Sequence, residues 1–516
     1  MSIDRILPKL ALVLILTVYG LFLAKPLNLV TADLGRHIKN GELIINGHYE
    51  VLKTNYYAYT YSDYPVLNHH WLSGVIFYAV WNMWGLAGLQ LFFIFLSLAA
   101  FLIFFDIARK KSGAGLAALL TIFIMPLLLE RDEIRPEAFS YLFSGVFLWL
   151  MFKYREGRVR WRTLLVLPIL EIIWVNLHIY FFLGPVIIGV FILEGLILKN
   201  GKTAKNLGVL FLTVLAAAFA NPNGFKGALA PMSIFKNFGY HLAENQPVWF
   251  IEKILPNPNY LIFKIVFFVL MLSFVLVLAR NKRQLNIPGL IFAIGFSIAG
   301  WLAIRNFAIF SLFALPIAAA NLAAIFKIKP ETARWLSRTA VTTWALAVLI
   351  VLSGELKTIY PKQQSPQLGL ENGNDKALDF FKENKLSGPI FNNYDIGGYL
   401  IYGLYPQEKV YPESDRRVFV DNRPEAYPAD FFTKTYIPMQ EDKDIWQEKS
   451  GLYKFNAIIF SYRDYTPWGQ TFFRRILDDP DWTTVFADKR VIILLKNNEV
   501  NKDIIAKYGK PLSIKR

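Results

Sequence analysis

The 516-residue sequence contains no cysteine and few charged residues for its length. Disulfides, thiolate nucleophiles and cysteine-ligated metal ions are therefore excluded. Charged residues make up only 18% of the chain, against about 25% in soluble globular proteins. The sequence also lacks the glycine-rich phosphate-binding motifs and the G-x-S-x-G motif, so nucleotide hydrolysis and serine-hydrolase chemistry gain no support. What remains is a chain dominated by apolar residues.

Long apolar runs recur from the N-terminus to about two thirds of the way along the chain. Hydrophobic residues account for 54% of the sequence, and a helix needs roughly 20 mostly apolar residues to cross a bilayer. The runs predict an all-α membrane bundle of about eleven transmembrane helices. Their expected positions are 10–30, 86–108, 114–129, 137–152, 163–178, 183–198, 206–220, 259–279, 286–304, 307–326 and 339–354.

Lysine and arginine are unevenly distributed among the loops that join these helices. They are concentrated in loops 109–111, 153–162, 199–205, 280–283 and 327–338. Loops of this kind face the cytoplasm, which predicts a cytoplasmic N-terminus and, after an odd number of spans, an extracytoplasmic C-terminal region. The net charge of +16 is explained by these clusters facing anionic lipid headgroups, so no nucleic-acid partner is expected. The N-terminus has no small-residue cleavage site and predicts a retained first span of a multi-pass plasma-membrane protein.

Composition divides the chain into three regions. Residues 1–355 form the predicted transmembrane domain, with long outer loops at 31–85 and 221–258, and the first loop contains an expected interfacial helix with Trp71, Trp81 and Trp84. Residues 356–374 form a polar linker, and residues 375–516 an extracytoplasmic α/β domain. Strands are expected there at 389–393, 417–421, 455–462, 483–487 and 491–496, and helices at 375–385, 428–439 and 468–478. Their alternation predicts parallel pairing at the centre of the sheet.

Charged residues and histidines gather at the ends of the spans on the predicted outer side. Asp33 follows the first span, and a helix would place Arg36 and His37 on the same face. The same loop ends with Asn68, His69 and His70, and the segment LLLERDEIRPEAF adds Glu130, Arg131, Asp132, Glu133, Arg135 and Glu137. For any one of these residues, a solvated or internally paired charge is the simpler interpretation. The set as a whole favours a site, because charges near hydrocarbon are costly unless they pair or serve a function.

These residue types allow three kinds of chemistry. A carboxylate beside a hydroxyl group can act as a general base, and arginines bind phosphate through two oxygens. Asp132 and Glu133 are the candidates for holding a divalent cation such as Mg or Mn, if one takes part.

Further polar residues lie in or near the expected spans. Arg305 stands between two apolar runs on the outer side, a position that suits the phosphate of a lipid-linked substrate. Glu244 and Trp249 are candidates for the same cleft, and a structural and a functional role are weighted equally for His178. For Glu171 and Glu194 we expect a neighbouring helix to satisfy the carboxylate.

Two segments stand out in the expected soluble domain, FNNYDIGGYLIYGLYP (391–406) and RVFVDNRPEAYP (417–428). The Gly397–Gly398 pair permits a tight turn and the close approach of another chain or a ligand. Asp395, Asp421 and Arg423 are expected at strand-to-helix edges, where they serve either as ligand contacts or as turn and cap residues.

Several of these motifs resemble those of GT-C-fold membrane glycosyltransferases. The pattern Asp33-x-x-Arg36-His37 with NHHWL resembles their first outer loop, and ERDEIRPEAF resembles their second acidic outer motif. NNYDIGGYLIY with RVFVDNRPEAY is similar to uncharacterised bacterial and archaeal members and, more distantly, to the WWDYG region of oligosaccharyltransferase catalytic subunits. Asn392 and Asn393 stand here in place of the tryptophan pair.

The resemblance implies transfer of a sugar, at the outer face, from a polyprenyl-phosphate or polyprenyl-diphosphate donor to a lipid, glycan or protein acceptor. It implies that Asp33 is the catalytic base or the carboxylate that orients the acceptor. Glu130, Asp132 and Glu133 would form the acidic cluster, and Arg305, with Arg131 or Arg135, would bind the donor phosphate.

Two other classes of protein remain as alternatives. Transporters and flippases commonly show inverted repeats and polar groups near the bilayer midplane, whereas this sequence shows no repeat and its polar residues concentrate on one face. A non-catalytic membrane scaffold would lack a cleft that joins Asp33, Asp132 and Arg305.

Overall fold

A computed structural model describes residues 3–234, 236–280, 285–355, 365–405 and 417–510. These residues fold into two compact units. The first unit comprises residues 1–26, 88–231 and 241–368, and the second comprises residues 27–87, 232–240 and 369–516. Most of the predicted cytoplasmic loop 280–283 and the first half of the predicted linker fall outside the described residues.

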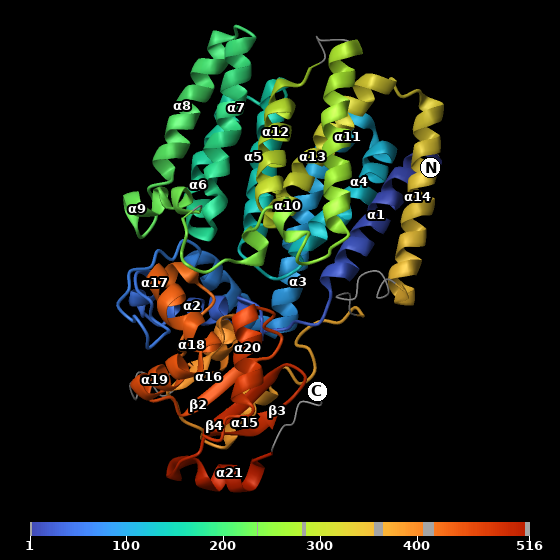
Figure 1. Ribbon diagram of the computed structural model, residues 1–516. Helices are drawn as coiled ribbons and strands as arrows, with labels where there is room; N and C mark the ends of the chain where they lie inside the picture. Colours follow the sequence, from blue (N-terminus) through green and yellow to red (C-terminus); the bar gives the residue numbers. More distant parts are fainter. Residues whose placement is uncertain (1–2, 235, 281–284, 356–364, 406–416, 511–516) are drawn as a thin grey trace. The chain divides into compact units, whose positions relative to one another are not determined.

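The first unit is a bundle of helices (Figure 1). Its longer helices are α1 (Ile3–Leu23), the second part of α3 (Trp71–Ser112), α4 (Ala114–Leu128), α5 (Glu137–Arg155), α6 (Val166–Leu177), α7 (Leu183–Ile197), α8 (Gly201–Ala217), α11 (Asn259–Arg280), α12 (Ile287–Leu302), α13 (Phe307–Phe326) and α14 (Pro330–Ser353). Short helices α9 (Gly224–Ala228) and α10 (Val248–Ile251) and the turns η2 (Leu129–Arg131), η3 (Trp161–Leu165), η4 (Ile179–Phe182), η6 (Ala243–Asn245) and η8 (Ile304–Asn306) connect them. A helix therefore lies at each of the eleven predicted spans.

Seven helical segments among the described residues are long and apolar enough to cross a membrane. They are Ile6–Leu23, Trp71–Ser112, Ala114–Arg131, Ile179–Ile197, Asn259–Arg280, Ile304–Phe326 and Pro330–Ser353. The predicted count of eleven is therefore not supported. Helix α6 has 12 residues and at 1.5 Å per residue is much shorter than a bilayer of about 30 Å, α12 and α8 have 16 and 17 residues, and α5 carries charges at both ends.

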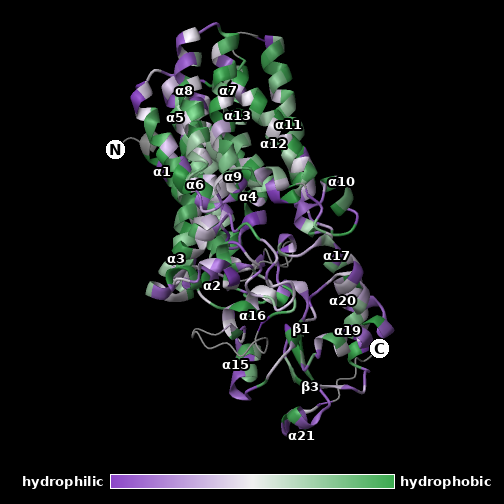
Figure 2. Cartoon of the chain, turned by 90° about the vertical axis from the view of Figure 1, so that its left-hand side faces the viewer, coloured by the Kyte–Doolittle hydropathy of each residue, from purple (hydrophilic) through white to green (hydrophobic). Residues whose placement is uncertain are grey.

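The helices of the first unit are coloured mostly as hydrophobic along their length, with polar residues at their ends (Figure 2). Seven apolar membrane-length helices make the chain a multi-pass membrane protein. Helix α3 bends at Gly85, which has a φ of 67°. The predicted interfacial helix with Trp71, Trp81 and Trp84 is thus the first part of α3, and it belongs to the second unit.

The second unit joins the first long loop to the C-terminal region. From the loop come α2 (Leu34–Ile45), η1 (Tyr49–Leu52) and the start of α3. The C-terminal region adds α15 (Lys376–Glu383), η10 (Tyr394–Ile396), α16 (Gly397–Leu404), η11 (Pro424–Ala426), α17 (Ala429–Phe431), a π-helical turn (Phe432–Tyr436), α18 (Ile437–Glu441), α19 (Lys443–Tyr453), α20 (Pro467–Ile476) and α21 (Lys502–Tyr508). The three predicted helices are present in this set, whereas α16, α19 and α21 were not predicted.

A four-stranded sheet forms the core of the C-terminal region. Its strands β1 (Ile390–Asn392), β2 (Ala457–Ser461), β3 (Trp482–Ala487) and β4 (Val491–Lys496) lie in the order β1-β2-β4-β3. Strands β1 and β2 are parallel, whereas β2 and β3 both run antiparallel to β4. The α/β class is confirmed, but parallel pairing at the centre is wrong. The parallel pair lies at the edge, and β3 and β4 follow each other closely enough to form an antiparallel hairpin.

The predicted strand at 417–421 does not join this sheet. Its backbone is bonded instead by the side chain of Asn392, which lies at the end of β1. Asn392 Oδ1 accepts from Phe419 N at 2.9 Å, and Asn392 Nδ2 donates to Val420 O at 2.7 Å. Val418 instead forms an isolated parallel bridge with Ala58 of the first loop. An apolar, β-branched run identifies extended backbone, but it does not identify the partner that satisfies its hydrogen bonds.

Backbone contacts join the first loop to the C-terminal region at several points within the second unit. Leu27 N donates to Gly369 O at 2.8 Å, and Glu371 N donates to Leu27 O at 2.9 Å. The hydroxyl of Tyr59 donates to Ile390 O at 2.9 Å, beside the sheet. Helices α2 and α16 pack side by side (Figures 1 and 2). Residues 27–87 are therefore a structural part of the C-terminal unit rather than an excursion from the bundle.

Candidate functional site

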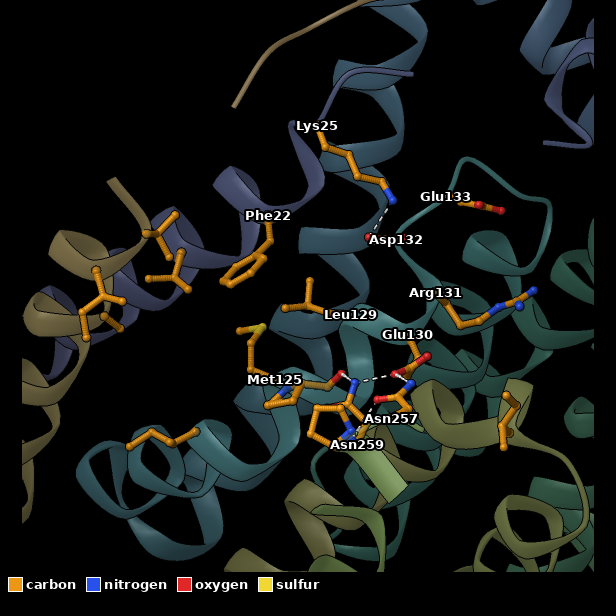
Figure 3. A pocket seen from close by; sticks show the side chains of 18 of the residues that line it. Phe22, Lys25, Met125, Leu129, Glu130, Arg131, Asp132, Glu133, Asn257 and Asn259 are labelled. Atoms are coloured by element: carbon orange, nitrogen blue, oxygen red, sulfur yellow. Dashed lines mark hydrogen bonds and ion pairs between the residues drawn. The ribbon is translucent and has the colours of Figure 1, made fainter. Parts of the chain in front are cut away.

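A pocket of about 630 Å³ opens within the first unit. Its apolar wall comes from α1, α4 and α14, with Val18, Phe22, Ile122, Met125, Trp344, Ala347 and Val351. The other end is polar. It is formed by residues from 129–135 and 256–259, by Glu244 of η6 and by Arg305 of η8. Figure 3 shows Phe22, Met125 and Leu129 on one side of the pocket and the acidic and amide side chains on the other. The pocket therefore suits a molecule with an apolar tail and a polar head.

Three arginines converge on one carboxylate at the polar end. Arg131 Nη1 lies 2.6 Å from Glu244 Oε2, and Arg135 Nη1 lies 3.3 Å from the same oxygen. Arg305 Nη1 lies 3.7 Å from Glu244 Oε1. Burial alone would raise the pKa of Glu244, but the three guanidinium groups outweigh it and hold this pKa well below its ordinary range. Glu244 is therefore the shared counterion of the arginine cluster Arg131, Arg135 and Arg305.

Two guanidinium donors of this cluster have no acceptor among the described residues. They are the buried atoms Arg131 Nη2 and Arg305 Nε. The rest of each guanidinium is engaged, since Arg131 Nε donates to Glu137 Oε1 and Arg305 Nη1 donates to Asn245 Oδ1 at 3.1 Å. A buried donor without an acceptor costs free energy, and both side chains line the pocket. The site is therefore built to accept additional oxygen ligands.

The acidic residues of the ERDEIRPEAF segment each have a different partner. Glu130 Oε1 accepts from the side-chain amides of Asn257, at 2.7 Å, and of Asn259 (Figure 3). Lys25 Nζ lies 2.7 Å from Asp132 Oδ2, and Arg135 Nη2 lies 2.8 Å from Glu133 Oε2. Burial raises the pKa of Asp132, although Lys25 opposes it, whereas Arg135 and Lys25 outweigh burial and lower the pKa of Glu133.

Asp132 and Glu133, the carboxylates considered for a divalent cation, each face a cationic side chain of their own. No cluster of three or more histidine, aspartate or glutamate side chains that could hold a metal ion occurs in the described part of the chain.

The polar residues deeper in the bundle differ in how their side chains are partnered. His178 Nδ1 lies 2.8 Å from Ser140 Oγ and also accepts from Tyr180 N, so it caps the turn η4. Glu194 pairs with Arg155 Nη2 at 2.6 Å, as expected. For Glu171 the expectation is wrong, because neither carboxylate oxygen has a hydrogen-bond partner among the described residues. This side chain lies against Gly184 of α7, where a side chain would leave no room for it.

Asp33 lies in the second unit, at the start of α2. It occupies the N-cap position, and its backbone oxygen accepts from His37 N at 3.1 Å, which confirms the expected helix. Its Oδ1 accepts a hydrogen bond from Asn422 Nδ2. Asn422 Oδ1 in turn accepts from Arg36 Nε at 3.0 Å. Asp33 and Arg36 are thus joined through the side-chain amide of Asn422.

The histidines of the first loop pack against one another. His37 is buried and meets the ring of His70 edge-on, with the ring centroids 5.3 Å apart. The rings of His69 and His70 are 4.0 Å apart. Phe77 of α3 closes the cluster beside His37. The three imidazoles therefore contribute to the packing of α2 against α3.

The candidates of the C-terminal region fall into two groups. Asp421 and Arg423 form a fully buried ion pair at 2.6 Å, and Arg423 Nη2 also donates to Asn55 Oδ1 at 3.1 Å. The two charges pair with each other and stabilise the turn 421–423. Asp395 differs, because burial and the nearby carboxylates of Asp464 and Asp33 raise its pKa to about 7. The protonation of Asp395 is therefore expected to change near neutral pH.

The sequence did not single out several residues that the structure places at these sites. Lys25, Asn257, Asn259 and Trp344 line the pocket of the first unit, and Asn422 contacts Asp33. Lys25 directly follows an apolar run and Asn422 lies between Asp421 and Arg423, which drew attention by their charge. A polar residue at the end of a span, beside a proline, is the signal that could have identified Lys25 and Asn257.

The fold is of the GT-C type, as the resemblance implied. No protein-family model matches the chain, and no curated protein matches it in sequence. The likeness is to solved structures of an archaeal oligosaccharyltransferase, AglB from Archaeoglobus fulgidus.

The structure of AglB in complex with an inhibitory peptide and a dolichol-phosphate gives a TM-score of 0.61 at 14% identity, and the match covers 97% of this chain and 75% of that one. A structure of an Archaeoglobus fulgidus oligosaccharyltransferase in the apo form gives a TM-score of 0.54 at 15% identity, with 89% of this chain and 69% of that one covered. A structure of an Archaeoglobus fulgidus oligosaccharyltransferase in complex with zinc and sulfate gives 0.54 at 14% identity, with 96% and 73% covered. At these identities the likeness establishes the fold.

Proposed function

We propose that this chain is a membrane glycosyltransferase that transfers a sugar from a polyprenyl-phosphate-linked donor to a lipid, glycan or protein acceptor. The observation that carries the proposal is the pocket of the first unit, in which an apolar wall ends at the arginine cluster. Two of its arginines, Arg131 and Arg305, have a buried donor without an acceptor among the described residues. A polyprenyl chain matches the wall, and phosphate oxygens match guanidinium donors. The AglB structure that contains a dolichol-phosphate supports a lipid-linked donor in general terms.

The proposed reaction needs few protein groups. The acceptor oxygen forms a bond to the anomeric carbon of the sugar while the bond from that carbon to the phosphate oxygen breaks. The acceptor proton passes to the carboxylate of Asp33, and the departing polyprenyl phosphate keeps the bonding electron pair. The resemblance assigns the stabilisation of this leaving group to Arg305, with Arg131 or Arg135.

We further propose that the chain lies in the plasma membrane, with its N-terminus in the cytoplasm and its second unit on the extracytoplasmic side. The density of lysine and arginine in one set of loops supports this orientation. Eleven crossings place all the loops rich in lysine and arginine on one side of the membrane. Any odd number of crossings places the two ends on opposite sides.

The function can be tested in cells that produce the full chain. Asp33→Asn and Asp33→Ala are compared with Asp63→Asn, an exposed aspartate of the same loop, by mass spectrometry of envelope glycans at matched protein levels. We expect a glycan to be lost in both Asp33 variants and retained in the control. An unchanged glycan profile in the Asp33 variants would refute the assignment of this residue. Loss of lipid-linked sugar translocation in proteoliposomes, without loss of a transfer product, would favour a flippase instead.

A further inference from the structure

The side chain of Asn422 connects the proposed catalytic carboxylate to a buried arginine. Asn422 Nδ2 donates to Asp33 Oδ1, and Asn422 Oδ1 accepts from Arg36 Nε at 3.0 Å. Arg36 is almost fully buried. Both ends of one amide are thus in use, which fixes its orientation, and the positive charge of Arg36 polarises the amide toward Asp33. This connection spans 389 positions of the sequence.

The backbone around Asn422 is held in place on both sides. Asp421 N donates to Tyr427 Oη at 2.9 Å, and Arg423 N donates to Asp421 Oδ1 at 3.0 Å. Arg423 also reaches Asn55, which belongs to the same loop as Asp33. The buried ion pair of Asp421 and Arg423 therefore anchors the turn that presents Asn422.

Glycines let the two helix starts approach closely enough for this contact. A Cβ on Gly398 would lie 3.1 Å from Ala32 O and 3.2 Å from Asn422 Nδ2. A Cβ on Gly35 would lie 2.8 Å from Gly398 O. Gly397 also leaves no room for a side chain, since a Cβ at this position would lie 2.6 Å from Asp421 Cα. The Gly397–Gly398 pair thus serves the close approach of two segments of this chain, α2 and α16.

From this geometry we infer that Asn422 is a positioning residue for Asp33, so that the C-terminal region completes the catalytic machinery. The inference rests on the proposed function. A hydrogen bond donated to a carboxylate stabilises its charged form and restricts its rotation. The amide therefore holds the carboxylate of Asp33 in one direction at the moment it receives the acceptor proton.

The test uses Asn422→Ala and the isosteric Asn422→Asp, which replaces the donor by a second acceptor. The control is Asn372→Ala, whose side chain is exposed in the same unit. Initial rates of product formation are measured across pH in membranes of producing cells, which contain the native donor and acceptor. Binding of decaprenyl phosphate to the purified full chain is measured in parallel.

We expect the rate to fall about 100-fold in both Asn422 variants, as for a misplaced catalytic group, and decaprenyl phosphate binding to stay within twofold of the wild type. The acidic limb of the pH–rate profile should move to higher pH in Asn422→Ala. In an Asp33→Asn background, Asn422→Ala should cause little further loss, because both substitutions act through one carboxylate.

The outcomes separate the two proposals. If Asp33→Asn is inactive but both Asn422 variants keep wild-type rates and pH profiles, the inference about Asn422 is refuted and the proposed function stands. If Asp33→Asn keeps full activity, the proposed role of Asp33 fails first. Where the Asn422 variants do not survive purification, Arg36→Lys tests the same chain of hydrogen bonds from its other end, and an unchanged pH profile there would likewise overturn the inference.

Discussion

Replacing Arg305 by lysine should weaken the binding of a polyprenyl phosphate while leaving the binding of its tail intact. Arg305 Nε is a buried donor that has no acceptor among the described residues, and lysine keeps the positive charge but removes the planar guanidinium. The substitution therefore separates the effect of charge from that of donor geometry.

The expected magnitude follows from the number of donors. One hydrogen bond between a charged donor and a phosphate oxygen contributes about 1.5–3 kcal/mol, which corresponds to about 10- to 150-fold in Kd. The side chain of Arg305 is 24% exposed, and water competes for its donors. We therefore expect a change near the lower end, about 10- to 30-fold.

The assay is titration of the full chain in lipid nanodiscs with decaprenyl phosphate and, separately, with decaprenol. Arg305→Lys should weaken the binding of decaprenyl phosphate and leave the binding of decaprenol unchanged, because the wall formed by α1, α4 and α14 is unaltered. Arg334→Lys, on an exposed position of α14, should change neither. Equal weakening of both ligands, or no weakening of decaprenyl phosphate, would refute the phosphate site.

Three further predictions concern the counterion, the packing and the pH dependence. Glu244→Gln should tighten decaprenyl phosphate binding about tenfold, because it releases the arginine cluster from its counterion. It should also lower the free energy of unfolding, measured by chemical denaturation, by about 1–2 kcal/mol, a value reduced because Glu244 is partly exposed. Gly41→Ala should destabilise the second unit by about 1–3 kcal/mol or more, measured by thermal unfolding, because its Cβ would lie 2.5 Å from the carbonyl carbon of Gly74 and 2.8 Å from Tyr78 Cβ. Asp395→Asn should flatten the fall in stability with rising pH. The folded pKa of about 7 lies above the ordinary 3.8, so the contribution of Asp395 is complete below about pH 4 and is lost as the pH rises through about 7.

Two of these predictions have a control variant, and the third has an outcome that would contradict it. For the packing it is Gly451→Ala, a helical glycine of α19 with nothing near its Cβ position, and equal destabilisation of both variants would contradict the packing argument. For the pH dependence it is Asp481→Asn, an exposed aspartate, measured by denaturation between pH 4 and 8. A wild-type slope in Asp395→Asn would show that other groups cause the effect. Weaker phosphate binding in Glu244→Gln would show that this carboxylate organises the arginines rather than competing for them.

Local patterns were enough to predict most of the secondary structure. Apolar runs of bilayer length identified the helices, and short runs rich in β-branched residues identified four of the five predicted strands. The errors arose where the outcome depended on length or partner. The apolar run at 163–178 is divided between the turn η3 and the short helix α6, and the run at 417–421 is paired with the side chain of Asn392 and with Ala58 instead of a strand.

Long-range partners could not be predicted from one sequence. The charges of ERDEIRPEAF predicted a polar site, but not that Lys25 would pair with Asp132 or that Glu130 would bind two asparagines from residues 257–259. Nor did composition indicate that residues 27–87 fold with the C-terminal region. Periodicity reports on the face of an element, whereas these contacts depend on how distant elements pack.

The balance of charge in the pocket indicates how an anionic headgroup can enter it. Four cationic side chains line the pocket, Lys25, Arg131, Arg135 and Arg305, and so do four carboxylates, Glu130, Asp132, Glu133 and Glu244. A phosphate therefore gains little from net charge. Beyond the two donors without acceptors, on Arg131 and Arg305, it gains further donors only by replacing a carboxylate as the partner of a cation. Glu244 is the carboxylate that three arginines share, so its replacement frees the most donors at once. The affinity for the polyprenyl-phosphate donor should thus depend on how firmly the turn η6 holds Glu244. A variant that loosens this turn without altering any arginine should bind phosphate more tightly.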